Sequence, residues 1–583
     1  MPFARSTGLV VAIAAALVLL PNLGGPPLWD DDEPRNAACS VAMLGSGDWI
    51  VPTFNGRLRV EKPVLVNWLH LAGFGVAGIN ETGARLASAL LTIGTCVLTA
   101  AIATAVIHPQ AGLWAGLVMA TCLWTGVAGR AATPDAPLAF FTTLALWLFV
   151  RGCRVPGPGG VGWRYGCPRL PPASAVAVGV ACGLAVLAKG PVGVILPLVA
   201  FGCFCWWQAA SDPGRVGPLH RRLATSLPAA WHGCRPLVIA GSALAVALPW
   251  YALVTVRTDG EWLRQFLLVH NVGRFAAPME GHSGSTVIYY PVVLLIGTFP
   301  WSIAWILVAG HACQRSRGTP PGETMGLRLA ICWAAAWIVP FCLSGTKLPG
   351  YVWPAYPALA IAAGSFLADW IGRPAASRDA WMRVAWGSLA ITGVALAVGL
   401  PIAVRTYVAD GAWLGLVGVV PVAGAAAAWV AQSAGRRRQA ATVWAATACG
   451  TVGLLVAIGP TCMGRAGGTR QLFTDVPAAA LGPVPVASFG APASAVFYAG
   501  RIAPAGRVPN LSGPAEAAAF VAENPGGHVV VNARFEEKFA RALPPDYGVL
   551  RSSSSFPTLQ EVVLFGPTTA PRIAADAPQP HRH

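Results

Sequence analysis

Long apolar stretches recur along the whole chain and are separated by short polar segments. A helix needs about 20 mostly apolar residues to cross the hydrocarbon core of a bilayer. By this criterion the pattern predicts about thirteen transmembrane helices, near residues 7–24, 85–107, 111–128, 136–150, 174–188, 191–208, 236–256, 287–309, 327–343, 351–371, 384–403, 412–431 and 440–460. The first stretch lacks a convincing small-residue cleavage site, so we expect an uncleaved helix. The predicted fold class is a mostly α-helical polytopic membrane protein.

After residue 463 the long apolar stretches give way to short alternating segments. Strands are predicted at 484–489, 528–533 and 561–565, and helices at 514–524 and 534–543. We expect residues 1–463 to form the membrane domain, with a first external loop at 25–84 that carries juxtamembrane helices. Residues 464–567 are expected to form a small α/β domain. Residues 568–583 are rich in Pro and Ala, which predicts disorder.

Composition excludes a soluble globular protein, because 55% of the residues are hydrophobic and only 11% are charged. The net charge of +16 comes from alternate loops, which carry Arg151, Arg154, Arg164, Arg169, Arg215, Arg221, Arg222, Arg235, Arg315, Arg317, Arg373, Arg378, Arg383 and Arg436 to Arg438. The positive-inside rule places these loops in the cytoplasm. The acidic loops between them, and the C-terminal domain, then face the periplasm. This distribution accounts for the positive charge without a nucleic-acid partner.

Charge is concentrated in the first external loop, between Leu28 and His70. The cluster includes Asp30, Asp31, Asp32, Glu33, Arg35, Asp48, Glu61 and Lys62. A long solvated connection between membrane helices is the simpler explanation. Apolar residues recur at helical spacing, first from Ala38 to Ala42 and then from Val64 to Leu69, which favours short amphipathic helices on the bilayer surface. Because charge beside a membrane is costly and usually functional, we expect the chemistry in this loop.

Two further external loops each hold one isolated charge at a predicted helix end. Asp135 begins a helix, where an acid can simply favour the helix dipole. Lys189 ends a helix, where a lysine can extend its ammonium group to the interface. Both positions also suit an outward-facing catalytic or phosphate-binding group, and the residues alone leave this choice open.

The loop from 257 to 285 contains Arg274 and His282. A guanidinium pairs with phosphate through two bonds at once, so Arg274 is a candidate phosphate ligand. His282 is a ligand, an acid or a plain loop residue. Lys347 and Tyr351 follow in a proline-rich segment at the next predicted external helix end.

Several motifs occur in a fixed order. They are D-E-x-R at 32–35, L-x-S-G-D-W-x-x-P at 44–52, E-K-P-x-L-x-x-W at 61–68, N-x-x-R-F at 271–275 and S-x-x-K-L-P-x-Y at 344–351. Together they resemble the ArnT-like, PMT-related integral membrane glycosyltransferases, over roughly residues 28–360. The resemblance implies a GT-C fold and a polyprenyl-phosphate sugar donor. Asn36 and Asn67 stand where the family often has Tyr, which leaves the identity of the sugar open.

The resemblance also implies roles for individual residues. The catalytic set comprises Asp32, Glu33, Glu61 and Asp135, with Asp32 as the group that orients or deprotonates the acceptor. The donor phosphate is bound by Arg35, Lys62, Lys189, Arg274, Lys347 and Tyr351. No cofactor is certain, and a divalent metal at Glu61 or His282 stays open.

The implied activity is transfer of a sugar, such as 4-amino-4-deoxy-L-arabinose, from undecaprenyl phosphate to lipid A or another envelope acceptor. The expected location is the periplasmic face of the bacterial inner membrane. One alternative is a mannosyl-type hexose transferase acting on protein or polysaccharide. A transporter of lipid or solute is a second alternative, and it predicts ionisable residues near the bilayer midplane. A noncatalytic membrane scaffold is a third.

Overall fold

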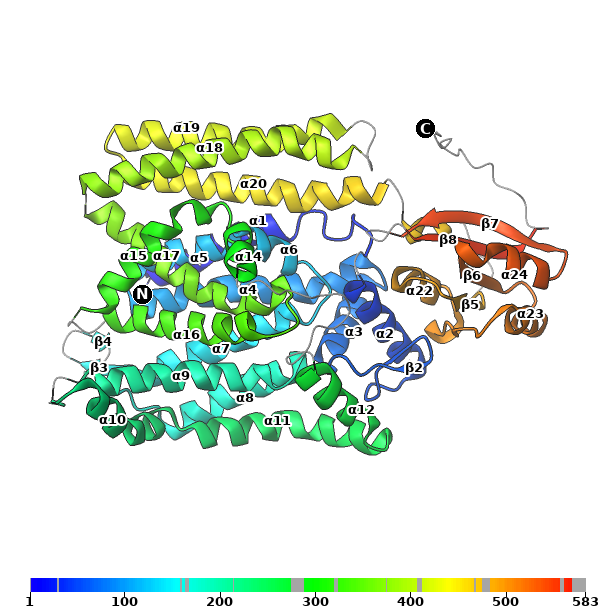
Figure 1. Ribbon diagram of the computed structural model, residues 1–583, viewed down its shortest axis with the longest axis horizontal. Helices are drawn as coiled ribbons and strands as arrows, with labels where there is room; N and C mark the ends of the chain where they lie inside the picture. The colour runs from blue at the N-terminus through cyan, green and yellow to red at the C-terminus, as the bar shows by residue number, and fades with distance from the viewer. Residues whose placement is uncertain are drawn as a thin grey trace. The chain divides into compact units, whose positions relative to one another are not determined.

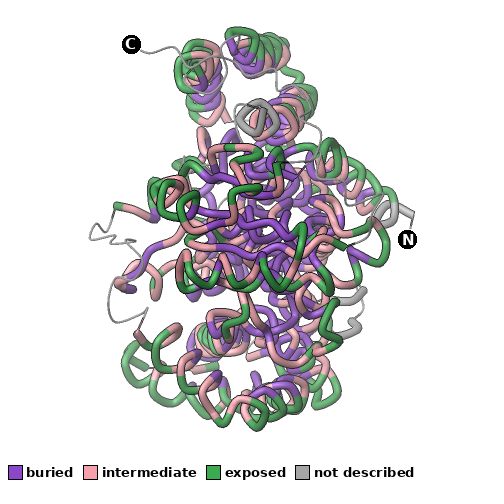
Figure 2. The backbone as a smooth tube through the Cα atoms, turned by 90° about the vertical axis from the view of Figure 1, so that its right-hand side faces the viewer, coloured by how far each residue is buried: buried purple, intermediate pink, exposed green. Residues whose placement is uncertain are grey.

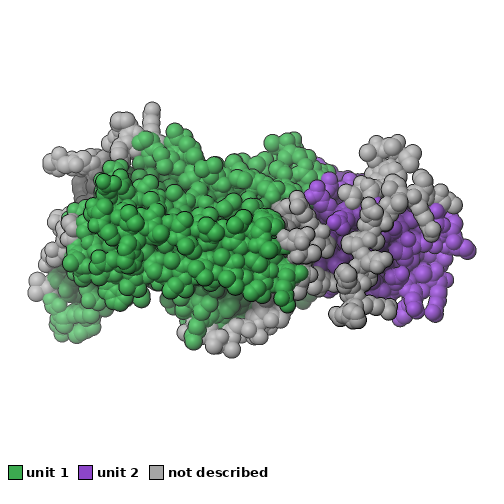
Figure 3. All heavy atoms as spheres, turned by 90° about the horizontal axis from the view of Figure 1, so that it is seen from above, with its two compact units in different colours: residues 1–26, 59–462 green, residues 27–58, 463–583 purple. Residues whose placement is uncertain are grey.

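The computed structural model of the protein describes residues 2–28, 31–157, 160–162, 167–212, 214–215, 217–273, 288–318, 323–373, 375–405, 411–465, 468–473, 483–555 and 560–568. The chain divides into two compact units, coloured separately in Figure 3. The first comprises residues 1–26 and 59–462, and we refer to it as the membrane unit. The second comprises residues 27–58 and 463–583 and is referred to as the sheet unit. Each therefore combines segments that lie far apart in the sequence.

The membrane unit is built from helices (Figure 1). They are α1 (Pro2–Leu19), α3 (Leu65–Ala77), α4 (Glu81–Val106), α5 (Pro109–Thr121), α6 (Leu123–Ala128), α7 (Asp135–Cys153), α8 (Pro172–Lys189), α9 (Val192–Ala210), α10 (Leu219–Cys234), α11 (Pro236–Arg257), α12 (Glu261–Arg264), α14 (Tyr289–Gly297), α15 (Trp305–Ser316), α16 (Glu323–Leu343), α17 (Tyr356–Gly372), α18 (Ala376–Val404), α19 (Val419–Ser433) and α20 (Arg437–Arg465). Short helices η1 (Gln265–Gly273), η2 (Trp301–Ala304), η3 (Pro349–Ala355) and η4 (Gly411–Gly418), and the hairpin β3 (Val155–Gly157) with β4 (Gly160–Gly162), connect them.

Within the described ranges, ten helices are long and apolar enough to cross a membrane, and a bent pair raises the number to eleven. Each of the thirteen predicted spans contains a described helix, but not always a continuous one. The predicted span at 287–309 is bent by 113° between α14 and η2. The predicted span at 111–128 is interrupted at Cys122, whose backbone is extended. The polytopic helical class is confirmed, and the sequence pattern missed these two breaks.

The two breaks meet inside the membrane unit. The Leu123 amide, at the start of α6, donates to the Phe299 carbonyl at the bend after α14, with N and O 2.9 Å apart. Trp301 Nε1 donates to Thr121 Oγ1 at 2.9 Å. Irregular backbone is tolerated at membrane depth only where its polar groups find protein partners. Each interruption therefore supplies the partner that the other requires.

Close packing of small residues holds neighbouring helices together. On α8, Gly179 and Gly183 face α11. A Cβ on Gly179 would lie 2.5 Å from the Ile239 carbonyl oxygen, and a Cβ on Gly183 would lie 2.7 Å from the Ala243 carbonyl oxygen. Such small residues four apart let helix backbones approach closely in a bilayer. The buried residues run through the centre of the bundle (Figure 2). This packing fixes the ends of α7 and α8, where candidate residues lie.

The sheet unit contains a four-stranded sheet in the order β5-β6-β8-β7. Its elements are β5 (Val486–Phe489), α22 (Ala493–Gly500), α23 (Pro514–Glu523), β6 (His528–Asn532), α24 (Glu536–Ala542), β7 (Tyr547–Ser554) and β8 (Glu561–Pro567), with the short helices η5 (Thr469–Phe473), η6 (Pro504–Gly506) and η7 (Ala533–Phe535). Strands β5 and β6 are parallel and the other pairs antiparallel. The predicted small α/β domain is confirmed, while α22 and β7 escaped prediction. Residues 569–583, predicted to be disordered, lie outside the described residues.

The N-terminal acidic segment belongs to this sheet unit. It forms α2 (Asp32–Ser46) and the hairpin of β1 (Thr53–Phe54) and β2 (Arg57–Leu58). A Cβ on Gly45 would lie 1.8 Å from the Ala505 carbonyl, so α2 touches the backbone of η6. Tyr498 of α22 accepts a hydrogen bond from the Leu28 amide at 3.1 Å. The apolar face of α2 is thus covered by residues that follow it by more than 400 positions.

Candidate active site

Asp135 and Lys189 form an ion pair at the ends of two contacting helices of the membrane unit. Asp135 is the first residue of α7, and Lys189 is the last residue of α8. An acid is favoured at a helix N-terminus and a cation at a C-terminus, so both helix dipoles support the pair. Lys189 Nζ donates to Asp135 Oδ1, and Thr133 Oγ1 donates to Asp135 Oδ2 at 3.4 Å. The side chain of Lys189 is only 13% exposed and that of Asp135 only 20%, so the pair is shielded from most solvent.

Tyr351 lies beside this ion pair. Lys189 Nζ is 5.0 Å from the centre of the Tyr351 ring, a distance at which a cation is attracted to an aromatic face. Gly350 comes close to the same carboxylate, because a Cβ there would lie 3.2 Å from Asp135 Oδ2. A glycine at 350 therefore lets η3 approach Asp135. Asp135, Lys189 and Tyr351 consequently form one cluster.

Lys347 occupies a neighbouring position at the C-terminus of α16. Its Nζ donates to the carbonyls of Phe341, Cys342 and Ser344 at 3.3, 2.8 and 3.0 Å. An ammonium group has three donors, so these bonds engage all of them and cap the helix. Lys347 Nζ also lies 5.6 Å from the centre of the Tyr290 ring. A phosphate would have to replace one of these carbonyls, and the longest bond, to Phe341, is the one most readily given up.

The two lysine–tyrosine pairs are connected through Phe341. Its carbonyl accepts the bond from Lys347, and its ring centre is 5.0 Å from that of Tyr351. Tyr290 Oη donates to the Leu348 carbonyl at 3.3 Å. Lys189 and Lys347 each have an aromatic neighbour, and Phe341 links the two pairs near the external ends of α8 and α16.

Lysine is rare in this chain. Of 40 Lys and Arg residues, the lysines are those at 62, 189, 347 and 538, and all others are Arg. Three of these four lie in predicted external loops. An ammonium group can bond three separately oriented carbonyls, as at Lys347, whereas a guanidinium is a planar fork.

The segment that carries Glu61 and Lys62 is anchored at a corner between α11 and α12. Trp262, which is fully buried, donates from Nε1 to the Arg59 carbonyl at 2.8 Å. The Trp262 ring stacks on Phe266 with centres 4.7 Å apart. Arg59, itself buried, pairs with Glu61 at 3.4 Å. Burial of Trp262 and Arg59 thus determines where the backbone before Lys62 lies.

The remaining N-terminal candidates lie on the first turn of α2 in the sheet unit. Asp32 and Glu33 are the first two residues, where the helix dipole favours negative charge. Glu33 is buried, with 3% of its surface exposed. The Arg35 guanidinium lies 5.7 Å from the centre of the Phe54 ring. Asp32, Glu33 and Arg35 are therefore held on a short rigid element rather than on an extended loop.

Two predicted site residues, Arg274 and His282, lie outside the described residues. Within the described part of the chain, no group of three or more His, Cys, Asp or Glu side chains is arranged to hold a metal ion. The predicted metal candidate Glu61 has Arg59 as its ion-pair partner. The question of a divalent metal at Glu61 or His282 stays open.

Sequence reasoning did not assign roles to Arg59, Tyr290, Gly350 or Trp262. Gly350 lies within the motif at 344–351, so its position was visible but its contact with Asp135 was not. Trp262 carried a weaker signal, a lone Trp beside Glu261 in an external loop. Hydrogen bonds from Gln265 and Arg264 hold the pKa of Glu261 below its ordinary value, which keeps this neighbouring residue charged. Trp262, beside this charged residue, is the side chain that fixes the backbone at Arg59.

Comparisons with known proteins agree with this architecture. The profile of the family "Dolichyl-phosphate-mannose-protein mannosyltransferase" matches residues 7–260. A Pseudomonas fluorescens protein named undecaprenyl phosphate-alpha-4-amino-4-deoxy-L-arabinose arabinosyl transferase 1 is 28% identical over 462 residues, covering 78% of this chain and 75% of that protein. A Shewanella sediminis protein of the same transferase name is 30% identical over 59% of this chain and 56% of its own length.

The fold comparison covers nearly the entire chain. The crystal structure of ArnT from Cupriavidus metallidurans bound to undecaprenyl phosphate superposes with a TM-score of 0.72 at 23% identity, over 97% of this chain and 98% of that one. The chain is a membrane glycosyltransferase whose GT-C fold is similar to that of ArnT. The apo crystal structure of the same ArnT gives a TM-score of 0.70. This ArnT-like enzyme is a multi-pass protein of the bacterial inner membrane.

Proposed function

We propose that the enzyme transfers a sugar from undecaprenyl phosphate to an envelope acceptor such as lipid A at the periplasmic face of the inner membrane. The sugar proposed is 4-amino-4-deoxy-L-arabinose, which the names of the Pseudomonas and Shewanella relatives support. The observation that carries the proposal is the pair of fixed lysines, Lys189 and Lys347, each beside a tyrosine ring at an external helix end. Such a pair suits an anionic lipid carrier.

The reaction forms one glycosidic bond and breaks another. An oxygen of the acceptor attacks the anomeric carbon of the sugar, the bond from that carbon to the phosphate oxygen breaks, and undecaprenyl phosphate leaves with the bonding electrons. The proton of the acceptor must pass to a base, and we assign this role to Asp32, with Glu33 as the alternative. Cations placed where charge develops lower the barrier by electrostatic stabilisation.

We assign the binding of the leaving phosphate to Lys62, Lys189 and Lys347, with Arg35 and Arg274 as further contacts. Asp135 holds Lys189 in place in the absence of donor, and the phosphate would compete with this carboxylate for the ammonium group. Tyr351 supports Lys189 through its ring and can offer its hydroxyl to a phosphate or sugar oxygen. Glu61 is assigned to sugar binding.

A mannosyl-type transferase is the second candidate. The match of residues 7–260 to the mannosyltransferase family supports it, since that family takes its sugar from a polyprenyl phosphate too. The two candidates share the cationic site and differ in the sugar and the acceptor, so one experiment on products separates them.

The test is mass spectrometry of lipid A and of envelope glycans from cells with and without the gene. Aminoarabinose on lipid A that disappears on deletion and returns with the wild-type gene supports the proposal. Loss of a hexose from protein or polysaccharide, with lipid A unchanged, replaces it with the second candidate. Envelope glycans that are identical in both strains would refute both.

Residue roles are tested by complementation of the deletion strain. Asp32→Asn removes the proposed base while keeping the size of the side chain, and we expect loss of product with normal protein abundance. The matched control is Asp546→Asn, which alters an aspartate of the sheet unit with no assigned role. Full activity of Asp32→Asn would move the proton acceptor elsewhere.

A further inference from the structure

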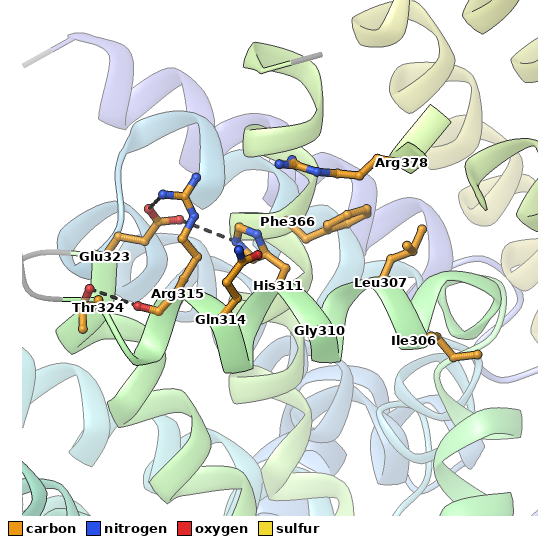
Figure 4. A pocket seen from close by; sticks show the side chains of 11 residues that line it. Ile306, Leu307, Gly310, His311, Gln314, Arg315, Glu323, Thr324, Phe366 and Arg378 are labelled. Carbon is orange, nitrogen blue, oxygen red and sulfur yellow. Dashed lines mark hydrogen bonds and ion pairs between the residues drawn. The ribbon is translucent and has the colours of Figure 1, made fainter. Parts of the chain in front are cut away.

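A cavity of about 610 Å³ lies among α15, α16, α17 and α18 (Figure 4). The side chains used below are Ile306, Leu307, His311, Arg315, Glu323 and Arg378. Glu323 begins α16, whereas Lys347 caps the other end of that helix. A helix of 21 residues is about 30 Å long. The cavity therefore lies at the cytoplasmic end of the membrane unit, remote from the candidate active site.

Positive charge exceeds negative charge around the cavity. The Asp369 carboxylate is the shared partner of three arginines: Arg315 at 2.7 Å, Arg373 at 3.2 Å and Arg378 at 2.5 Å. The second carboxylate, Glu323, is 3.9 Å from Arg315. Three guanidinium groups thus face two carboxylates, which leaves a net positive charge. Each guanidinium has five N–H donors, so Arg315 and Arg378 keep donors for a ligand.

His311 fills the space between the two carboxylates. Its Nε2 is 2.9 Å from Ser365 Oγ and 3.6 Å from Glu323, and its Nδ1 is 3.8 Å from Asp369. Figure 4 shows Arg315 and Glu323 side by side, with Arg378 entering from another helix. The polar wall is therefore already ordered by contacts within the protein.

The opposite wall of the cavity is apolar and reaches the outer surface of the bundle. Ile306 is 81% exposed, although it lies on a membrane helix, so its side chain is available to lipid. Leu307 and the buried Phe366 continue this surface inward. The cavity thus joins a lipid-facing apolar side to a cationic side, which matches a molecule with an acyl chain and an anionic headgroup.

We propose that this cavity binds the phosphate headgroup of an anionic phospholipid from the cytoplasmic leaflet. Arg315 and Arg378 donate to the phosphate oxygens, and Ile306 and Leu307 contact the upper part of an acyl chain. Basic pockets between transmembrane helices at the cytoplasmic side are suited to such headgroups. Because Arg315 lies on α15 and Arg378 on α18, the bound lipid fastens α18 to the rest of the membrane unit.

Gly310 offers a test that leaves every charge in place. It lines the cavity, and a Cβ there would meet no atom within 4 Å. Gly310→Leu therefore fills the cavity without a backbone clash. Arg378→Gln instead removes one headgroup donor. Arg383→Gln is the matched control, because Arg383 is an exposed arginine of the same helix that does not line the cavity.

The measurement is native mass spectrometry of the full-length enzyme in neutral detergent, titrated with phosphatidylglycerol. We expect one tightly bound lipid in the wild type and in Arg383→Gln, and about tenfold weaker binding in Arg378→Gln, since charge-assisted bonds are the strong ones. Gly310→Leu should lose this lipid while remaining folded by circular dichroism. If Gly310→Leu retains the tight lipid, the proposal is wrong.

Two competitors test whether the acyl chains alone or the phosphate alone are sufficient for binding. Monoglucosyl diacylglycerol, which has acyl chains but no phosphate, should not displace the bound phosphatidylglycerol at equal concentration. Inorganic phosphate at the same concentration should not displace it either, because it lacks the apolar contacts. Displacement by the first would mean a purely apolar groove, and displacement by the second a free-anion site; either result overturns the proposal.

Discussion

The ion pair of Asp135 and Lys189 allows a structural role to be separated from a catalytic one. Lys189→Met removes the ammonium group and leaves a carboxylate that is only 20% exposed without its ion-pair partner. Breaking a buried pair on one side costs about 3–5 kcal/mol. Partial exposure screens these charges, so we expect a loss of about 2 kcal/mol in unfolding free energy. The same loss is expected for Asp135→Asn.

Removing both partners should reverse this loss. The double variant Asp135→Asn/Lys189→Met leaves neither charge unpaired, so its thermal midpoint in detergent should return close to that of the wild type. Activity should not return if Lys189 stabilises the leaving phosphate. Loss of one such contact costs about 100- to 1000-fold in kcat.

The assay is therefore a comparison of two quantities in four proteins: wild type, both single variants and the double variant. Thermal midpoints report the ion pair, and the rate of sugar transfer to lipid A in isolated membranes reports the phosphate contact. Lys538→Met, at an exposed lysine of α24, is the control for the chemistry of the substitution. If the double variant recovers both stability and rate, Lys189 serves only to hold Asp135, and its assigned role is wrong.

Three further outcomes follow from the geometry. Gly190→Ala should lower the free energy of unfolding by about 2 kcal/mol or more. At this position φ is +88°, and the added Cβ would lie 2.7 Å from an aromatic carbon of Phe266. The control is Gly202→Ala, where nothing lies within 4 Å, and it should leave the thermal midpoint unchanged or raise it. Trp262→Phe keeps an aromatic ring but loses the hydrogen bond to the Arg59 carbonyl. The rate of sugar transfer should fall, while the free energy of unfolding decreases by only about 1–2 kcal/mol. An unchanged rate would show that Trp262 does not position the segment that carries Lys62. Burial lowers the pKa of His528 below its ordinary value, so the unfolded sheet unit binds the proton more readily than the folded one. The stability of the sheet unit should therefore fall as the pH drops below about 6.5. Hydrogen-exchange protection of β6 should decrease from pH 7.5 to 5.5 in the wild type but not in His528→Gln, and equal protection of the wild type at both pH values would contradict the reasoning.

The sequence predicted the location of the candidate residues better than their contacts. Alternation of membrane spans places the start of α7 and the end of α8 on one side, so Asp135 and Lys189 were assigned correctly to the same face. Hydropathy cannot report whether Lys189 bonds a carboxylate or whether Lys347 caps a helix. Those contacts depend on helix ends being positioned to within an ångström by packing.

The two broken helices illustrate the same limit. Cys122 and Phe299 lie in stretches whose average hydropathy is that of a continuous span, and Pro300 was the only local sign of an interruption. The break at Cys122 becomes favourable because the Leu123 amide finds the Phe299 carbonyl. Such a partner, remote in sequence, has no trace in the local pattern. The spacing of apolar residues predicted the apolar face of α2, but it did not indicate that residues near 498 and 505 cover it.

The membership of residues 27–58 in the sheet unit has a consequence for biosynthesis. About 400 residues separate Leu58 from the next part of that unit, at Met463. At about 5–20 residues per second, the ribosome needs about 20–80 s to deliver the missing strands. During that interval α2 is already outside the membrane without the backbone that will cover Val41 and Gly45, so a nascent chain arrested before residue 463 should recruit periplasmic chaperones, and a C-terminal truncation should be degraded rather than merely inactive.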